Sequence, residues 1–224
     1  MNVLVIGANG QIGQIVVDKL KNHAAHDVIA GVRKDEQKKA YENKGITSRF
    51  IDLEGSIEDM EKAMENVEAV VFSAGSGGST GADKTMMIDF DGAVKSIEAA
   101  KNAGVKRYVM VSAVNADDRE YWSYDMGENS IGGYYFAAKH YADVWLENSG
   151  LDYTVIRPTL LLNDEGTRKV EVAKKLQQEG KKLEIPREDV ANLIVASLDH
   201  DNTIGKSFDA NGGNDDVDEA VKKL

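Results

Sequence analysis

The sequence predicts a doubly wound α/β protein, in which helices cover both faces of a mostly parallel sheet. One observation is an unbroken apolar run, Val3 to Ile6, which ends at Gly7. A run of this kind bounded by glycine is typical of a strand buried on both faces. The other is that strand and helix patterns alternate along the rest of the chain. This alternation is the order that builds a parallel sheet from βαβ units.

The elements follow in order after the first strand. Strands are predicted at 27–32, 47–51, 68–73, 107–112 and 153–157, and helices at 12–20, 35–43, 56–65, 83–103 and 133–148. Ser56 and Asp59 have capping-box spacing, and Asp35 suits a helix N-cap. After Pro158 we expect a helix at 187–198, a strand at 206–210 and a terminal helix at 215–224. We predict a single domain, 1–224, in which about 158–224 contributes a small substrate-side region.

The composition limits the classes of function. The 224 residues carry a formal net charge of −11, which argues against nucleic acid or an anionic membrane as a partner. There is no cysteine, so disulfides, thiolate chemistry and cysteine metal sites are excluded. The first residues lack the features of a signal peptide, and no run is long enough to span a membrane. We expect a cytoplasmic protein, a monomer or small homo-oligomer, that acts on a small molecule.

A glycine-rich turn joins the first strand to the first helix. Gly7, Gly10 and Gly13 are spaced G-x-x-G-x-x-G between these two elements. The first glycine allows a tight turn, the second lets a pyrophosphate approach the backbone, and the third lets the helix pack on the strand. The helix N-terminus offers unpaired N–H groups to phosphates. The turn therefore predicts dinucleotide binding by Gly7, Asn9, Gly10, Gln11, Ile12 and Gly13.

Residues after the next strands indicate which dinucleotide binds. Arg33 ends the second strand, 20 residues after Gly13, where a cofactor without a 2′-phosphate usually meets an acidic residue. A guanidinium matches a phosphate bidentately, so we predict NADP rather than NAD. Asp52 and Leu53 follow the third strand; Asp52 either reaches the adenine edge or serves as a turn carboxylate. Small residues after the fourth strand would lie beside a ribose, namely Ser73, Ala74 and Gly75.

Tyr135 and Lys139 form Y-x-x-x-K on a predicted helix, so both face the same side. A phenol is a poor proton donor at neutral pH unless a nearby cation lowers its pKa, and an ammonium one turn away can do that. Ser112 ends the fifth strand and could hydrogen-bond the same carbonyl group. The alternative is a half-buried tyrosine beside a lysine that reaches to solvent.

Two other groups of residues need an interpretation. The histidines, His23, His26, His140 and His200, are scattered, show no ligand spacing and predict no metal site. Tyr121, Trp122 and Tyr124 lie in a long loop before the Tyr135 helix, where they form either a substrate lid or surface packing.

With these residues placed, the chain resembles the short-chain dehydrogenase/reductase superfamily, and most closely its atypical branch of small NADP-binding proteins. The resemblance lies in the segments 7–13, 74–78, 83–89, 103–112, 135–143, 151–158 and 186–191. It implies a Rossmann-like sheet of order 3-2-1-4-5-6 with a seventh strand near 206–210. It also implies NADP on the glycine turn, a ribose contact from Lys139, and Ser112, Tyr135 and Lys139 at the catalytic positions. Asp89 stands where the superfamily usually has an active-site Asn, and a carboxylate cannot donate as an amide does.

The resemblance favours an NADP-dependent oxidoreductase that transfers hydride to a small carbonyl, quinone or flavin-type acceptor. In this interpretation Tyr135 protonates the acceptor, Lys139 lowers the tyrosine pKa, and Ser112 orients the carbonyl. One alternative is a non-catalytic NADP(H) sensor that binds a partner protein. Another is a sugar-nucleotide epimerase or dehydratase, although the residues after Pro158 leave little material to hold a nucleotide sugar.

Overall fold

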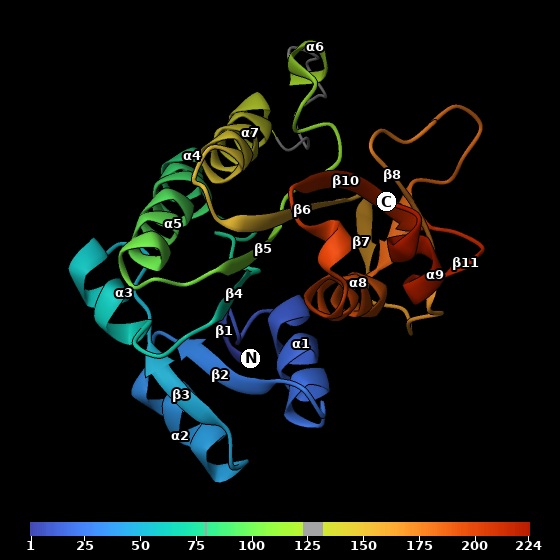
Figure 1. The fold of residues 1–224 in the computed structure, drawn as a ribbon. Helices are drawn as coiled ribbons and strands as arrows, with labels where there is room; N and C mark the ends of the chain where they lie inside the picture. Colours follow the sequence, from blue (N-terminus) through green and yellow to red (C-terminus); the bar gives the residue numbers. More distant parts are fainter. Residues whose placement is uncertain (79, 123–131) are drawn as a thin grey trace.

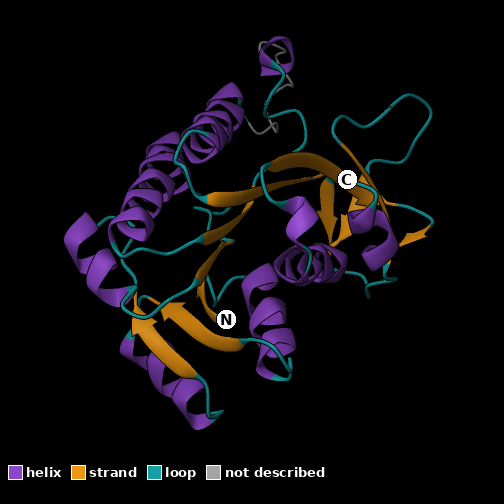
Figure 2. Cartoon of the chain, viewed as in Figure 1, coloured by secondary structure: helices purple, strands orange, loops and turns teal. Residues whose placement is uncertain are grey.

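The computed structural model describes residues 1–78, 80–122 and 132–224, and its main feature is a nine-stranded sheet (Figures 1 and 2). Seven strands run parallel in the order β3-β2-β1-β4-β5-β6-β10. Their bounds are Thr47–Phe50, Asp27–Val32, Asn2–Ile6, Ala69–Phe72, Arg107–Val111, Asp152–Pro158 and Lys206–Gly212. The predicted doubly wound fold and its strand order are confirmed.

The sheet separates two layers of helices and two hydrophobic cores. On one face pack α1 (Gln11–Lys21), α2 (Asp35–Asn43), α8 (Arg187–Asp199) and α9 (Val217–Lys222). On the other pack α3 (Ile57–Ala63), α5 (Ala93–Asn102) and α7 (Gly133–Glu147). Val3 and Val5 of β1 enter the first core, while Leu4 and Ile6 enter the second. The strand is buried on both faces, which explains why it has no polar alternation.

The region after Pro158 contains strands that the sequence did not predict. Antiparallel strands β8 (Lys169–Ala173) and β11 (Asp215–Asp216) extend the main sheet beyond β10, and β7 (Leu160–Leu162) pairs with β9 (Glu184–Pro186) in a small separate sheet. These strands are short, and their half-buried residues give only a weak period-2 signal. Three strands of this region, β8, β10 and β11, therefore belong to the main sheet.

Three predicted helix features are corrected. The single helix predicted at 83–103 consists of α4 (Ala82–Lys84), the π-helix η1 (Thr85–Gly92) and α5. The N-cap of α2 is Lys34, so Asp35 lies in the first turn, where its charge still suits the helix dipole. The terminal helix starts at Val217 rather than Asp215, because the Asp216 side chain caps it. The Ser56 cap is confirmed, since its side chain accepts from the Asp59 backbone N–H.

Two short elements complete the chain, α6 (Arg119–Trp122) and the 3₁₀ helix η2 (Asp201–Thr203). Among the described residues no helix is both long enough and apolar enough to cross a membrane.

Arg107, at the start of β5, joins two strands to the layer that carries α8. Its guanidinium donates to the Asp152 carbonyl at 2.6 Å, to Thr154 Oγ1 at 2.6 Å and to the Ser197 carbonyl at 2.8 Å. It also donates to Thr203 Oγ1 at 2.9 Å. Burial lowers the pKa of Arg107 to about 10, so the group stays ionised at neutral pH. One side chain thus satisfies four acceptors that come from β6, α8 and η2.

We predict that Arg107→Lys destabilises the protein by about 2–4 kcal/mol, because an ammonium cannot reach all four acceptors and buried acceptors are left unpaired. Chemical denaturation measures the change in the free energy of unfolding. The control is Arg168→Lys, which alters a half-exposed ion pair with Asp218 and should change stability by less than about 1 kcal/mol. Equal effects of the two substitutions would contradict the role assigned to Arg107.

Candidate active site

The predicted cofactor residues gather at the carboxyl ends of neighbouring parallel strands. Gly7 follows β1, Arg33 follows β2, Asp52 lies just after β3, and Ser73 follows β4. Since these strands are adjacent in the sheet, their ends form one edge (Figure 1). Open α/β sheets bind ligands at this edge.

The glycine turn leaves no room for side chains at two of its positions. Gly7 has a φ of +85°, and a Cβ there would lie 2.7 Å from the Ala74 backbone nitrogen. A Cβ on Gly13 would lie 2.1 Å from the Gly7 carbonyl oxygen. The steric tasks expected of these two glycines, a tight turn and close packing of helix on strand, are confirmed.

The N-terminus of α1 is open toward the sheet edge. Its N-cap is Gly10, which has no side chain to pair with the helix, and the first turn carries no acidic residue. The N–H groups of Gln11–Gly13 therefore have no intrahelical acceptor, an arrangement that can bind an anion. A Cβ on Gly10 would lie 3.1 Å from the Gly7 carbonyl oxygen, while Asn9 is exposed at the tip of the turn. In charge and shape this cradle fits a pyrophosphate.

Basic side chains surround the end of β2. Arg33 is exposed, and its backbone N–H donates to Gln37 Oε1 at 3.0 Å. Lys84 lies near enough for Arg33 to lower the pKa of its ammonium, although the stronger effect of Glu54, paired at 2.7 Å, raises it overall. The end of β2 therefore carries the exposed Arg33 with Lys84 nearby, which is paired with Glu54. Lys84 was not identified from the sequence, because it lies about 50 residues from Arg33.

Asp52 contacts a neighbouring backbone group in a turn, and Leu53 packs in the core. Asp52 Oδ1 accepts from the Glu54 backbone N–H at 3.0 Å, the contact of a turn carboxylate. Leu53 is buried, and a Cβ on Gly92 would lie 2.8 Å from the Leu53 Cβ. Of the two interpretations of Asp52 that the sequence left open, these contacts favour the turn.

The segment after β4 is tied to Asp89. The Ser73 backbone N–H donates to the Ile6 carbonyl at 3.0 Å, which holds the segment against β1. Gly75 faces Asp89, and a Cβ on it would lie 3.0 Å from Asp89 Oδ1. The Ser76 backbone N–H donates to Asp89 Oδ2 at 2.9 Å. Asp89 therefore shapes this part of the sheet edge from the π-helix η1, an element that often marks functional sites.

Lys139 and Asp89 form a buried ion pair. Lys139 Nζ lies 3.2 Å from Asp89 Oδ1 and 3.4 Å from the Val111 carbonyl oxygen, and the two residues are 6% and 2% exposed. Burial lowers the pKa of Lys139, but Asp89 and Tyr135 raise it by more. The ammonium thus stays charged, and its charge is balanced by Asp89.

Tyr135 lies on the same face of α7 as Lys139, whose Nζ is 5.8 Å from the centre of the phenol ring. The sequence predicts that Lys139 lowers the pKa of Tyr135. In the structure Lys139 has this effect, but other groups outweigh it and the pKa is raised overall. Burial raises the pKa of Tyr135, Lys139 lowers it, and the charges of Asp89 and Asp143 raise it further, so that it lies above its ordinary value of 10. The two carboxylates and burial outweigh the single ammonium.

Ser112 lies beside Asp143, which follows Lys139 by one turn of α7. Ser112 Oγ and Asp143 Oδ1 are buried and lack a hydrogen bond of ordinary geometry to any described residue, but the hydroxyl is close enough to lower the carboxyl pKa. Asp143 Oδ2 accepts from Arg157 Nε at 2.9 Å. Burial nevertheless raises the pKa of Asp143 to about 6. Asp143 was missed, although its spacing of four from Lys139 could have revealed it.

Aromatic rings line α7 at this end of the molecule. The Tyr121 ring meets Phe136 edge-on at 5.2 Å, and Phe136 meets Tyr135 at 5.4 Å. The Trp122 ring meets His140 at 5.0 Å. Tyr121 and Trp122 therefore pack on α7, whereas the prediction for Tyr124 lies outside the described residues.

The expectation that the histidines show no ligand spacing was wrong for His23 and His26. Their Nε2 atoms lie 3.2 and 3.0 Å from the two oxygens of Asp199, and their rings stack at 4.6 Å. Each Nδ1 faces a donor, the Ala25 backbone N–H at 3.3 Å or the Met1 ammonium at 3.5 Å. Both Nε2–H groups therefore donate to Asp199, whereas a metal-binding histidine normally donates through its other nitrogen.

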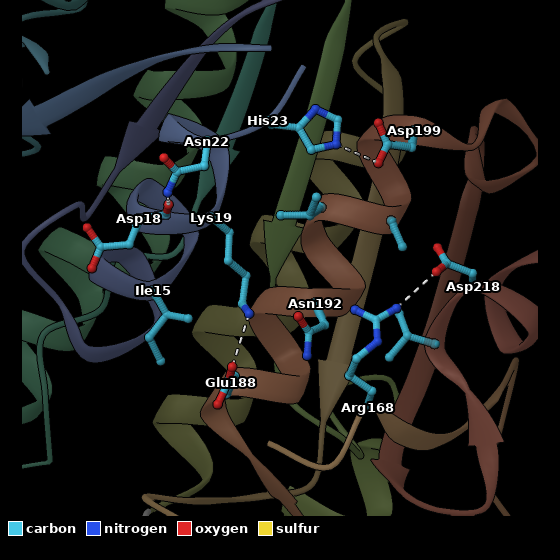
Figure 3. Close-up of a pocket in the computed structure, with 13 residues that line it drawn as sticks. Ile15, Asp18, Lys19, Asn22, His23, Arg168, Glu188, Asn192, Asp199 and Asp218 are labelled. Atoms are coloured by element: carbon cyan, nitrogen blue, oxygen red, sulfur yellow. Dashed lines mark hydrogen bonds and ion pairs between the residues drawn. The ribbon is translucent and has the colours of Figure 1, made fainter. Parts of the chain in front are cut away.

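A groove of about 680 Å³ lies between α1 and α8, away from the predicted site residues (Figure 3). An ion pair crosses it between Lys19 of α1 and Glu188 of α8 at 3.1 Å, and a second pair, between Arg168 and Asp218 at 2.9 Å, lies at its border. Its charged groups are thus largely satisfied by one another. Two of the buried side-chain atoms without a hydrogen-bond partner among the described residues, Ser112 Oγ and Asp143 Oδ1, lie instead near the sheet edge.

Comparison with known proteins places this geometry in a family. The chain is 48% identical to the uncharacterized sugar epimerase YhfK of Bacillus subtilis, and the alignment covers all of both chains. A solved structure from Bacillus halodurans, whose name suggests an NAD-dependent epimerase/dehydratase, has 39% identity and a TM-score of 0.89 and covers both chains fully. Sanguinarine reductase of Eschscholzia californica is 28% identical over 99% of this chain and 93% of its own. The model of the family described as NAD(P)H-binding matches residues 7–201, and the chain therefore belongs to this family.

Proposed function

We propose that the protein is an NADP-dependent oxidoreductase that transfers hydride to a small carbonyl, quinone or flavin-type acceptor. The observation that carries the proposal is the open N-terminus of α1 behind a turn that only glycines permit, with Arg33 at the end of the next strand. When bound, the nicotinamide supplies the hydride, and the protein supplies binding and orientation.

Different residues at the sheet edge bind different parts of the cofactor. The first turn of α1 receives the pyrophosphate, and Arg33 pairs with the 2′-phosphate. The small residues after β4, Ser73, Ala74 and Gly75, leave space for a ribose. Lys139 has one ammonium proton beyond those directed at Asp89 and Val111, and we assign it to the nicotinamide ribose.

We favour a reductase over an epimerase. Sanguinarine reductase, which aligns over nearly all of this chain, is named for a reduction. Two relatives are named as epimerases, but the residues after Pro158 form a short region, which we expect to be too small to hold a nucleotide sugar. A non-catalytic NADP(H) sensor would have the same cofactor site, and turnover of NADPH with any acceptor excludes it.

The first prediction concerns cofactor choice. NADPH should raise the melting temperature more than NADH at equal concentration, because only NADPH offers a phosphate to Arg33. Arg33→Asp should narrow or reverse this difference. The control is Lys106→Asp, which makes the same change in charge at the opposite edge of the sheet and should leave the difference intact. Equal shifts by both cofactors in the unmutated protein would refute NADP specificity.

The second prediction concerns the glycine turn. Gly10→Val should leave the protein folded, because the only close neighbour of the new Cβ is the Gly7 carbonyl oxygen at 3.1 Å. It should abolish NADPH binding, because the side chain occupies the path of the pyrophosphate. Circular dichroism checks the fold and calorimetry measures the affinity. A folded variant that still binds NADPH would show that the motif is only a turn.

A further inference from the structure

We propose that the groove between α1 and α8 binds a small aliphatic molecule that carries a positively charged amino group at each end. The groove lies away from the predicted cofactor residues, so this inference goes beyond the proposed hydride transfer and does not depend on it. It rests on a buried amide oxygen without a hydrogen-bond partner, on the charge of the groove, and on apolar side chains that lie between two groups of acceptors.

Asn192 of α8 offers an unpaired acceptor to the groove. The residue is only 5% exposed, and its Nδ2 donates to Asp189 Oδ1 at 3.2 Å. Its Oδ1 has no hydrogen-bond partner among the described residues, and Figure 3 shows the amide between the side chains of Lys19 and Arg168. The oxygen is therefore suited to a ligand that donates a hydrogen bond.

Asp189 fixes the orientation of this amide. It is fully buried and accepts from the backbone N–H groups of Thr167 at 2.9 Å and Arg168 at 2.8 Å. Because a carboxylate only accepts hydrogen bonds, the Asn192 nitrogen must face Asp189 and the oxygen must face away from it. The acceptor is thus held in place before a ligand arrives, which lowers the cost of ordering it on binding.

The charge of the groove favours a cation over an anion. Within the described residues, its lining holds a lysine, an arginine and four carboxylates, namely Asp18, Glu188, Asp199 and Asp218. With His23 counted as neutral, these groups leave a formal charge of −2. Lys19 and Arg168 are each paired with a carboxylate, at 3.1 and 2.9 Å. A ligand with two ammonium groups would balance the remaining charge.

Asp199 provides acceptors at the other end of the groove. Its two oxygens accept from His23 and His26 at 3.2 and 3.0 Å, and no lysine or arginine pairs with it in the part of the chain that the structure describes. Its side chain is 33% exposed, and each carboxylate oxygen can accept more than one hydrogen bond. Asp199 can therefore accept from an ammonium group while it keeps both histidines.

Apolar side chains lie between these two acceptors. Four residues of α8 share one face at the spacing i, i+3, i+4 and i+7, namely Asn192, Val195, Ala196 and Asp199. Ile15 of α1 lines the same groove. At about 1.5 Å per residue, Asn192 and Asp199 are about 10 Å apart along the helix axis. An aliphatic stem of this length can cover Val195 and Ile15 while each of its ends meets an acceptor.

The groove has the size of a small-molecule site, and one of its carboxylates is shared. Its volume of about 680 Å³ lies within the range of roughly 300–1,000 Å³ that is typical of ligand pockets. Glu188 lies one turn before Asn192 on α8 and is paired with Lys19 at 3.1 Å. An ammonium group at Asn192 would therefore share Glu188 with Lys19.

The ligand class is tested by calorimetry with three amines, at low salt and without cofactor. Octamethylenediamine, whose extended length is close to the spacing of Asn192 and Asp199, should bind. Octylamine has the same stem but one ammonium group, and putrescine has two ammonium groups on a shorter stem. Each should bind at least about tenfold more weakly, because each loses one charged hydrogen-bond contact. Equal affinities of the three amines, or no binding of octamethylenediamine, would overturn the proposal.

Two substitutions remove the acceptors one at a time. Asn192→Leu keeps the size of the side chain but removes the amide oxygen, while Asp189 keeps its donors from Thr167 and Arg168. Asp199→Asn removes the charge at the other end. Each should weaken the binding of octamethylenediamine at least about tenfold, and circular dichroism checks the fold. Because Asp199 is an exposed residue, its variant keeps the test decisive if Asn192→Leu does not fold. Unchanged affinity in the folded variants would refute the site.

Lys19→Gln should change the affinity in the opposite direction. It frees Glu188 from its ion pair, so octamethylenediamine should bind up to about fivefold more tightly, which a purely structural role of the groove would not produce. The control for the lost charge of Asp199 is Glu65→Gln, at an exposed residue just beyond α3 in the other helix layer, which should leave the affinity unchanged. Weaker binding in Lys19→Gln, or a loss in Glu65→Gln equal to that in Asp199→Asn, would contradict the proposal. None of these outcomes bears on NADPH binding at the sheet edge, so the two proposals fail separately.

Discussion

The contact between the Gly7 backbone and its two neighbours is the constraint on which the molecule depends. At this point β1, the first turn of α1 and the segment after β4 approach one another closely. A Cβ on Gly7 would lie 2.7 Å from the Ala74 backbone nitrogen, and a Cβ on Gly13 would lie 2.1 Å from the Gly7 carbonyl oxygen. The close approach brings the α1 N-terminus to the centre of the sheet edge. It also holds Ser73 and Ala74 beside it, so that one steric condition positions both the open N-terminus of α1 and the small residues after β4.

Helix α7 links this cofactor edge to a second set of buried charges. Its Tyr135, Lys139 and Asp143 follow one another at spacings of four, and each faces a different partner. Asp89 of η1 forms an ion pair with Lys139, while Ser112 and Arg157, at the ends of two strands, lie against Asp143. The same helix that carries a familiar catalytic spacing therefore presents groups whose charges are largely balanced. The residue types alone do not establish proton transfer, because acidity depends on the partners of each group.

The sequence predicted those elements whose pattern is visible within one short segment, and it missed features that depend on contacts between distant segments. The parallel strands and most helices follow from apolar runs and periodicity, which each segment displays by itself. Strands β7, β8 and β9 are short and only half buried, so their patterns carry little information before their pairing partners are known. The π-helix was equally hidden, because 85–92 lies inside the continuous helix predicted at 83–103. The closeness of His23 and His26 to Asp199 joins segments more than 170 residues apart, beyond any spacing rule.

The sequence by itself determined the doubly wound fold, the glycine turn and the identity of the groups at the strand ends, because glycine conformation and strand burial are properties of short segments. Tertiary structure decided what those groups can do. Only the folded chain brings Asp89 to 3.2 Å from Lys139 and Asp143 beside Ser112, and only there does burial strengthen the effect of each carboxylate. Burial weakens the acidity of Tyr135 most, and two carboxylates weaken it further: Asp89, 46 residues earlier, which the packing of η1 on α7 brings close, and Asp143, 8 residues later on α7 itself.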